Sequence, residues 1–225
     1  MNTDYRHEWK APLSPTDLLL LRPRLAAIMQ PDAHAVDGTY FVRSLYFDTP
    51  DDRALRQKID GVSRREKFRI RCYDLSPHSI HLEKKSKVAG LGYKEKVPLS
   101  AQEVAALLRG DTGWMEDDPR PLVQELRLKM LLQQLRPCTI VDYIREPFVF
   151  PAGNVRVTLD HHIRTGLRCT DLLDPHCPTI PAGDAPILME VKWDEFLPQI
   201  IRDAIALEGR RGEAFSKYAQ CRIYG

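Results

Sequence analysis

The sequence lacks the segments that would place a protein in or across a membrane. No apolar run reaches the roughly 18 residues that a membrane-spanning helix needs. The first residues, Met1 to Lys10, are charged and contain no apolar core of a secretion signal. We therefore expect a soluble, cytoplasmic protein without a membrane segment. A membrane protein as partner, and the oligomeric state, stay open.

The cysteines lack the C-x-x-C spacing that many zinc sites use, and their number is odd. The five are Cys72, Cys138, Cys169, Cys177 and Cys221. We interpret all of them as free thiols in a reducing compartment and expect no zinc site.

The sequence also has no Walker-type phosphate loop, no repeat, and no Ser-His-Asp or Cys-His arrangement for nucleophilic catalysis. The net charge is only +2, although 33 basic and 31 acidic residues are present. A dedicated nucleic-acid-binding protein would be more basic, so we expect no nucleic acid as partner. With 43% hydrophobic residues, the chain can form a core, and we expect one domain over residues 1–225.

The sequence does contain a period-two alternation of charged and apolar residues, which is typical of strands with two unlike faces. Between Arg65 and Tyr73, for example, Arg69 and Arg71 alternate with Phe68 and Ile70. Eight such runs lie at 5–10, 41–48, 65–73, 83–87, 94–96, 143–145, 155–160 and 189–193.

Helices are predicted between these strands. The expected helices run over 14–29, 100–108, 122–135, 196–207 and 213–221, with loops at 111–120 and 172–186. Ser100 and Glu103 form a capping box. Pro23 should kink or split the first helix. Gly90 to Gly92 is expected to form a hairpin turn.

The charged faces require an explanation, because like charges opposite each other on neighbouring strands destabilise a sheet. Ordinary solvated sheet surface is one interpretation. The other is an α+β fold in which an antiparallel eight-stranded β-barrel turns these charges inward around a polyanion, with helices packed outside. Glu8, Glu83 and Glu190 would then offset the repulsion and could coordinate a divalent cation. Lys84 has the opposite parity from Lys85 and should face outward.

Asp160, His161 and His162 are a weak candidate for a metal cluster, because adjacent strand residues point to opposite faces.

The motifs, taken in order, resemble the VTC domain, the polyphosphate polymerase domain of the vacuolar transporter chaperone complex. This domain is similar to CYTH phosphatases and RNA triphosphatases, and all belong to the triphosphate tunnel metalloenzyme superfamily. The matching segments are 6–10 (RHEWK), 44–50 (SLYFDTP), 67–73 (KFRIRCY), 82–85 (LEKK), 143–145 (YIR), 155–160 (VRVTLD), 189–192 (MEVK) and 216–218 (SKY).

The resemblance implies a tunnel in which basic side chains hold a triphosphate and a carboxylate holds the catalytic Mn²⁺ or Mg²⁺. The implied phosphate ligands, with Lys96 added because it shares a face with Lys94, are Lys10, Arg69, Arg71, Lys85, Lys94, Lys96, Tyr143, Arg145, Arg156, Ser216 and Lys217. The residues expected to be catalytic are Lys10, Arg69, Arg71, Lys85 and Glu190. The candidate metal ligands are Glu190, Glu8 and Glu83.

The resemblance further implies a metal-dependent phosphotransferase that moves the γ-phosphoryl group of ATP to a polyphosphate chain. Arg6 stands where CYTH hydrolases carry the first Glu of an E-x-E-x-K strand, which favours the VTC type. Two alternatives stay open: a hydrolase of tripolyphosphate or nucleoside triphosphates, and a non-catalytic polyphosphate- or nucleotide-binding module. The presence of Glu190 favours catalysis over binding alone.

Overall fold

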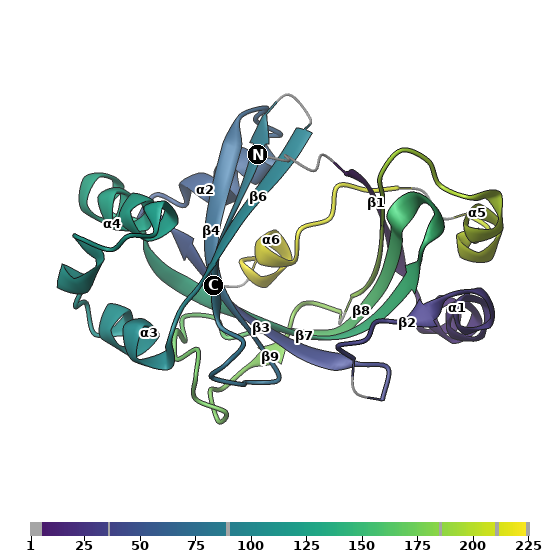
Figure 1. Ribbon diagram of the computed structural model, residues 1–225, viewed down its shortest axis with the longest axis horizontal. Coiled ribbons are helices and arrows are strands. Elements are labelled where there is room, and N and C mark those ends of the chain that lie inside the picture. The colour runs from purple at the N-terminus through teal and green to yellow at the C-terminus, as the bar shows by residue number, and fades with distance from the viewer. Residues whose placement is uncertain (1–5, 36, 89–90, 185, 210–211, 224–225) are drawn as a thin grey trace. The chain divides into compact units, whose positions relative to one another are not determined.

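The fold was analysed in a computed structural model, which describes residues 6–35, 37–88, 91–184, 186–209 and 212–223 (Figure 1). The strands are β1 (His7–Leu13), β2 (Gln30–Pro31), β3 (Tyr40–Asp48), β4 (Arg65–Tyr73), β5 (His81–Val88), β6 (Leu91–Pro98), β7 (Arg136–Phe150), β8 (Val155–Thr165), β9 (Ile180–Pro181) and β10 (Ile187–Trp193). The α-helices are α1 (Pro15–Ile28), α2 (Arg53–Ile59), α3 (Ala101–Leu108), α4 (Pro121–Gln133), α5 (Gln199–Ile205) and α6 (Lys217–Cys221). Short 3₁₀ turns lie at Gly113–Met115 and Ala152–Asn154.

The chain divides into two compact units. The first unit comprises residues 1–41, 143–163 and 181–216, and the second comprises residues 42–142, 164–180 and 217–225. The strand order in the first unit is β1-β10-β8-β7, and in the second unit it is β7-β3-β4-β5-β6. β7 occurs in both because its first half belongs to the second unit and its second half to the first.

The core of the first unit forms between the apolar face of its strands and two helices. Alternate residues of β8 and β10, including Val157, Leu159 and Val191, are fully buried. They pack in one cluster with Leu21 of α1 and Ile201 of α5. The residues between them on the strands therefore lie on the opposite face, and these are the charged ones.

The second unit repeats this arrangement with different helices. Phe68 and Ile70 of β4 and Leu82 of β5 are buried in one cluster with Leu107 of α3 and Leu126 of α4. Helices thus cover the apolar face of the strands, as the period-two pattern predicts. Lys84 lies on the same side of the strands as these apolar residues, and its side chain reaches Glu125 of α4.

All eight predicted strands are present, and the α+β class with an antiparallel sheet and flanking helices is confirmed. The helix at 100–108 begins with the predicted capping box between Ser100 and Glu103. The last two helices are shorter than expected, and α2 was not predicted at all. Tyr5 and Gly90, which belong to the predicted first strand and hairpin turn, lie outside the described residues.

Of the two expected effects of Pro23, the split of the first helix is wrong, since α1 is continuous through Pro23, and the kink stays a prediction. Proline removes one backbone hydrogen bond, to the carbonyl four residues earlier. That carbonyl belongs to Leu19, whose residue is 66% exposed, so water can bind the freed oxygen. Leu21 and Leu25, on either side of Pro23, are buried on one face of the helix and favour its continuity.

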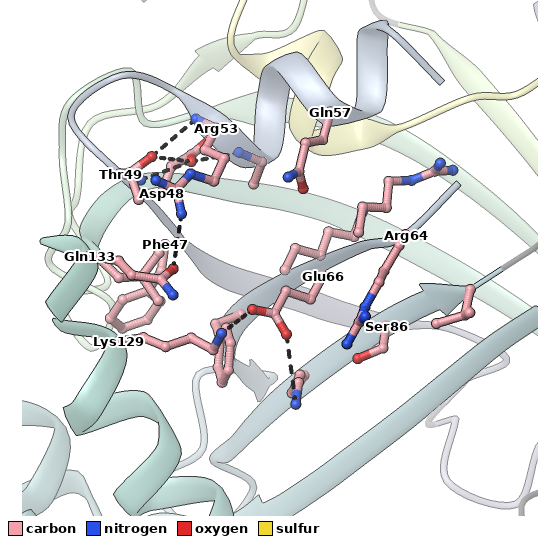
Figure 2. Close-up of a pocket in the computed structure, with 17 residues that line it drawn as sticks. Phe47, Asp48, Thr49, Arg53, Gln57, Arg64, Glu66, Ser86, Lys129 and Gln133 are labelled. Carbon is pink, nitrogen blue, oxygen red and sulfur yellow. Dashed lines mark hydrogen bonds and ion pairs between the residues drawn. The ribbon is translucent and has the colours of Figure 1, made fainter. Parts of the chain in front are cut away.

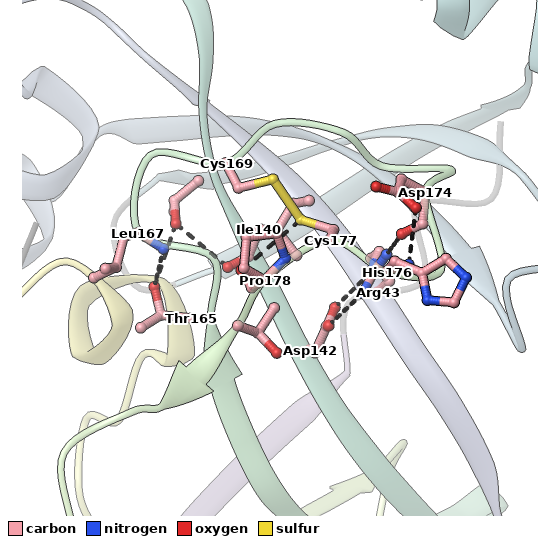
Figure 3. Close-up of a disulfide and its surroundings, with 12 residues drawn as sticks. Arg43, Ile140, Asp142, Thr165, Leu167, Cys169, Asp174, His176, Cys177 and Pro178 are labelled. Atoms are coloured by element: carbon pink, nitrogen blue, oxygen red, sulfur yellow. Dashed lines mark hydrogen bonds and ion pairs between the residues drawn. A yellow bond between two sulfur atoms is a disulfide. The ribbon is translucent and has the colours of Figure 1, made fainter.

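The interpretation of all cysteines as free thiols is also wrong. Cys169 and Cys177 form a disulfide, whereas Cys72, Cys138 and Cys221 are free. Figure 3 shows the disulfide in the loop that follows β8. Cysteine counting cannot find such a pair, because the pairing depends on how the loop returns on itself.

The same loop is held by a buried arginine. Arg43 donates two hydrogen bonds to Asp142, at 2.9 and 2.8 Å, and a third to the backbone oxygen of Asp174 at 2.5 Å (Figure 3). Burial raises the pKa of Asp142, although Arg43 opposes this.

Within the described ranges, no helix combines the length and the apolar composition needed to cross a membrane.

Two leucines of α4 provide a test of this core. Leu126 is fully buried, whereas Leu132 is 80% exposed. Leu126→Ala should lower the free energy of unfolding by about 2–5 kcal/mol through lost burial and a cavity. Leu132→Ala, the matched control, should change it by less than about 0.5 kcal/mol. Denaturant titrations of both variants check this, and equal effects would contradict the assigned face of α4.

Candidate functional site

The charged face of the second unit consists of cross-strand rows on β4, β5 and β6. Lys67, Lys85 and Lys94 are register partners across the three strands. The next row along contains Arg69, Glu83 and Lys96. A row of three lysines is unfavourable by itself, because like charges opposite each other repel.

Glu83 is the centre of this face and holds three cations. Its Oε2 lies 2.6 Å from Arg69 and 3.9 Å from Arg71, and its Oε1 lies 2.6 Å from Lys94 Nζ. Burial alone would raise the pKa of Glu83, but the charges of these three partners outweigh it and hold the pKa far below its ordinary value. Glu83 is therefore ionised and offsets part of the repulsion.

β3 contributes two hydroxyl groups that the sequence reasoning did not assign to the site. Arg71 donates a hydrogen bond to Ser44 Oγ at 3.0 Å, and Arg69 donates one to Tyr46 Oη at 2.9 Å. Burial opposes ionisation of Tyr46, but Arg69, Lys67 and Arg71 lower its pKa to about 7. The period-two pattern of 41–48 already placed Ser44 and Tyr46 on one face, so the signal was available.

α6 lies against this face. The ring of Tyr218 stacks on Tyr46 with centroids 4.9 Å apart, and its hydroxyl donates a hydrogen bond to Asp48. Burial and the neighbouring Asp48 raise the pKa of Tyr218, so it stays protonated as a donor. Lys217, a predicted phosphate ligand, is the first residue of α6 and is half-buried. Ser216 directly precedes it, in the last segment of the first unit.

The charged face of the first unit brings Lys10 and Glu190 together. The two residues are register partners on β1 and β10, and Lys10 Nζ lies 3.2 Å from Glu190 and 3.0 Å from Glu8. Lys192 also pairs with Glu190. Burial would lower the pKa of Lys10, but Glu190 and Glu8 raise it above its ordinary value. Lys10 therefore carries a permanent charge between two carboxylates.

The other predicted basic residues of this unit also have acidic partners. Arg145 makes two hydrogen bonds to Asp160, at 2.6 and 2.8 Å, and its guanidinium lies 5.3 Å from the ring centre of Tyr143. Arg156 lies 2.8 Å from Asp32 and donates a hydrogen bond to Tyr40 Oη at 2.9 Å. Burial would lower the pKa of Arg145, but Asp160 raises it well above its ordinary value.

A divalent cation would fit the carboxylates of β1 and β10 by donor type. Glu8 and Glu190 converge on one point, and Mg²⁺ or Mn²⁺ prefers such oxygen ligands. In the structure that point is taken by the ammonium group of Lys10, so a metal ion would have to replace this contact. Among the described residues, no group of three or more His, Cys, Asp or Glu side chains is placed to hold a metal ion.

Two further residues that the sequence singled out, Lys84 and His161, have structural partners. Lys84 lies 2.6 Å from Glu125 of α4, so it faces outward as expected. His161 Nε2 lies 2.7 Å from Glu146, which also binds Arg22 of α1. Burial would raise the pKa of Glu146, but His161 and Arg22 lower it to about 2. His161 therefore braces α1 against β7 and β8.

Solved structures show which class of fold this is. HpAC1 from Hippeastrum, an assigned adenylyl cyclase described as having a dominant triphosphatase activity, is 15% identical, with 96% of this chain and 94% of that chain covered and a TM-score of 0.56. An assigned adenylate cyclase from Bacillus halodurans is 17% identical, with 85% and 82% covered and a TM-score of 0.52. The chain thus shares its fold with these two proteins.

The sequence identifies the family more closely. The family model of the VTC domain matches residues 5–223, which span both units. The chain therefore belongs to the VTC domain family, and the resemblance found in its motifs is confirmed. No curated protein matches the sequence.

The charge on Glu83 predicts a pH dependence. The folded pKa lies below the ordinary 4.5, so the stabilisation by Glu83 is present above pH 4.5 and is lost as the pH falls. From about pH 7 to about pH 3, the free energy of unfolding should therefore fall more steeply in the wild type than in Glu83→Gln. Denaturant titrations measure this, with the exposed Glu195→Gln as control. Parallel curves for wild type and Glu83→Gln would contradict the ion-pair network.

Proposed function

We propose that the charged faces bind a linear phosphate chain and that the protein transfers the γ-phosphoryl group of ATP to polyphosphate. One observation carries the proposal. On β4, β5 and β6, the register puts eight basic side chains on the same face as a single carboxylate, Glu83: Arg65, Lys67, Arg69, Arg71, Lys85, Lys87, Lys94 and Lys96. Glu83 alone cannot offset the repulsion among these eight basic side chains, and an anionic ligand would reduce the repulsion that remains.

The chemistry of the residues suits phosphate. Arg69 and Arg71 present guanidinium groups, which can bind two phosphate oxygens at once, and Lys67, Lys85 and Lys94 add point charges. Glu83 holds Arg69, Arg71 and Lys94 before any ligand binds, and hydroxyl groups also hold the two arginines. Little ordering of these three side chains therefore remains to be done. Lys10, Arg145 and Arg156 of the first unit stay predicted phosphate ligands.

The proposed transfer needs positioning and charge neutralisation more than covalent catalysis. A terminal oxygen of polyphosphate attacks the γ-phosphorus of ATP, the bond from that phosphorus to the β–γ bridging oxygen breaks, and ADP leaves with the electron pair. Arg and Lys side chains stabilise the charge on the transferring group. When bound, Mn²⁺ or Mg²⁺ would neutralise phosphate charge, and Glu190 with Glu8 would be its ligands; Glu83 is an additional candidate.

Hydrolysis is the second candidate function. Water in place of the polyphosphate end would give ADP and free phosphate with the same electrostatic requirements. The triphosphatase activity described for HpAC1 favours this alternative at the level of the fold. A non-catalytic binding module is the third. Incubation of the pure protein with ATP and Mn²⁺ separates the three functions. Polyphosphate would accumulate with a polymerase, free phosphate with a hydrolase, and neither with a binding module.

The cytoplasmic location stays a prediction.

Loss of a single arginine should weaken the binding of tripolyphosphate. Arg69→Ala or Arg71→Ala should each cost about 1.5–3 kcal/mol of binding free energy, because each removes a charge-assisted contact. Adenosine should not compete. Isothermal titration at moderate salt measures the affinity, with Arg109→Ala, an exposed residue of the second unit, as control. Wild-type affinity in both variants of the charged face would count against this site.

Glu190→Gln should separate chemistry from binding. The amide keeps the shape but binds a hard cation poorly. Turnover of ATP with Mn²⁺ should fall by orders of magnitude, whereas metal-free binding of tripolyphosphate should stay equal or tighten, since a negative charge has gone. If Glu190 only holds Lys10 and Lys192, the melting temperature falls and turnover follows the fraction of folded protein. Near-normal turnover in a well-folded variant would exclude Glu190 from the mechanism.

A further inference from the structure

The second unit contains a cavity of about 420 Å³ that the proposed function does not use. It lies between α2, the C-terminal half of α4, and the strand side on which Glu66, Phe68 and Ser86 lie (Figure 2). This volume is in the range of pockets that hold small organic ligands. The cavity lies within one compact unit, so a single part of the fold forms it.

The lining of the cavity contains more basic residues than its two acidic residues, Asp48 and Glu66, can neutralise. Asp48 is fully engaged, since it accepts hydrogen bonds from the backbone of Thr49, Ala54 and Leu55 and from Tyr218. Glu66 is paired with Lys129 and lies 3.8 Å from Lys84. These are the two acidic residues of the lining, and each already has its partners.

Two arginines of the lining have no such partner. In the described part of the chain, neither Arg53 nor Arg64 forms an ion pair. Arg53 donates a 3.3 Å hydrogen bond to Gln133, and it interacts electrostatically with Asp51, which does not line the cavity. Figure 2 shows the side chain of Arg64 reaching toward Ser86, and Gln57 of α2 pointing to the cavity. Two guanidinium groups that form no ion pair are suited to bidentate contact with a phosphate group.

The floor of the cavity is apolar, in contrast to its rim. Phe47, Phe68 and Leu135 line it, and each is at least nine-tenths buried. An inorganic phosphate chain would gain nothing from such a surface. A ligand with a phosphate group on an uncharged, partly apolar body would use the arginines, the amides of Gln57 and Gln133, and the floor.

We propose that this cavity binds a small phosphorylated organic molecule, with its phosphate on Arg53 and Arg64 and its body toward the apolar floor. The site differs from the proposed phosphate-chain face. Phe68 and Ser86 are each one residue away from Arg69 and Lys85 along their strands, so their side chains point to the opposite side of the sheet. Arg65 and Lys67 belong both to the lining of the cavity and to the charged face, so the two sites are neighbours.

AMP is a suitable probe, since it joins a doubly charged phosphate to a neutral sugar and a flat base. Binding of labelled AMP is measured by equilibrium dialysis without metal. The background protein is the full chain with Arg69→Ala and Arg71→Ala, because these two substitutions weaken the proposed phosphate-chain site. Arg53→Ala and Arg64→Ala are then each added to this background singly. Arg56→Ala is the matched control, because Arg56 lies on α2 near Arg53, is exposed and does not line the cavity.

The proposal predicts that the background and its Arg56→Ala derivative bind AMP equally, and that Arg53→Ala and Arg64→Ala each weaken binding by tenfold or more. Adenosine and inorganic phosphate should compete at least tenfold less well than AMP. Three results would overturn it: no saturable AMP binding in the background, AMP binding that is unchanged by both substitutions, or full competition by tripolyphosphate or inorganic phosphate. Melting temperatures of the variants show whether they remain folded.

Discussion

The ion pairs of Glu83 with Arg69, Arg71 and Lys94 are the interaction on which the charged face of the second unit depends. One buried carboxylate keeps three cations side by side on neighbouring strands, where repulsion would otherwise separate them or destabilise the sheet. The first unit uses the same device, with Glu190 beside Lys10 and Asp160 beside Arg145. Cations that a ligand would need are thus already oriented by acids of the protein.

This arrangement has a consequence for binding. A phosphate chain bound as proposed would not meet free arginines but would compete with carboxylates and hydroxyl groups for them. Tyr46 belongs to the same balance, because the surrounding cations lower its pKa to about 7 despite burial. The cavity beside this face differs in that Arg53 and Arg64 form no ion pair among the described residues.

The direction of the charged faces follows from the apolar ones. Val157, Val191, Phe68 and Ile70 are buried under helices, and a strand alternates sides at each residue. Charged residues between them therefore have to lie on the other side. A shift of one residue in register would bury Arg69 or Arg71 against α3 and α4, at a cost that no local contact offsets.

The sequence by itself determined the strand positions, the two unlike faces, the capping box at Ser100 and the family, because each depends on neighbouring residues or on a fixed order of short motifs. Only the tertiary structure decided which carboxylate holds which cation, since partners such as Arg145 and Asp160 come from different strands. It also decided the disulfide of Cys169 and Cys177, the continuity of α1 through Pro23, and the cavity under α2. These depend on chain segments that meet only after folding, and no periodicity in the sequence encodes their distances.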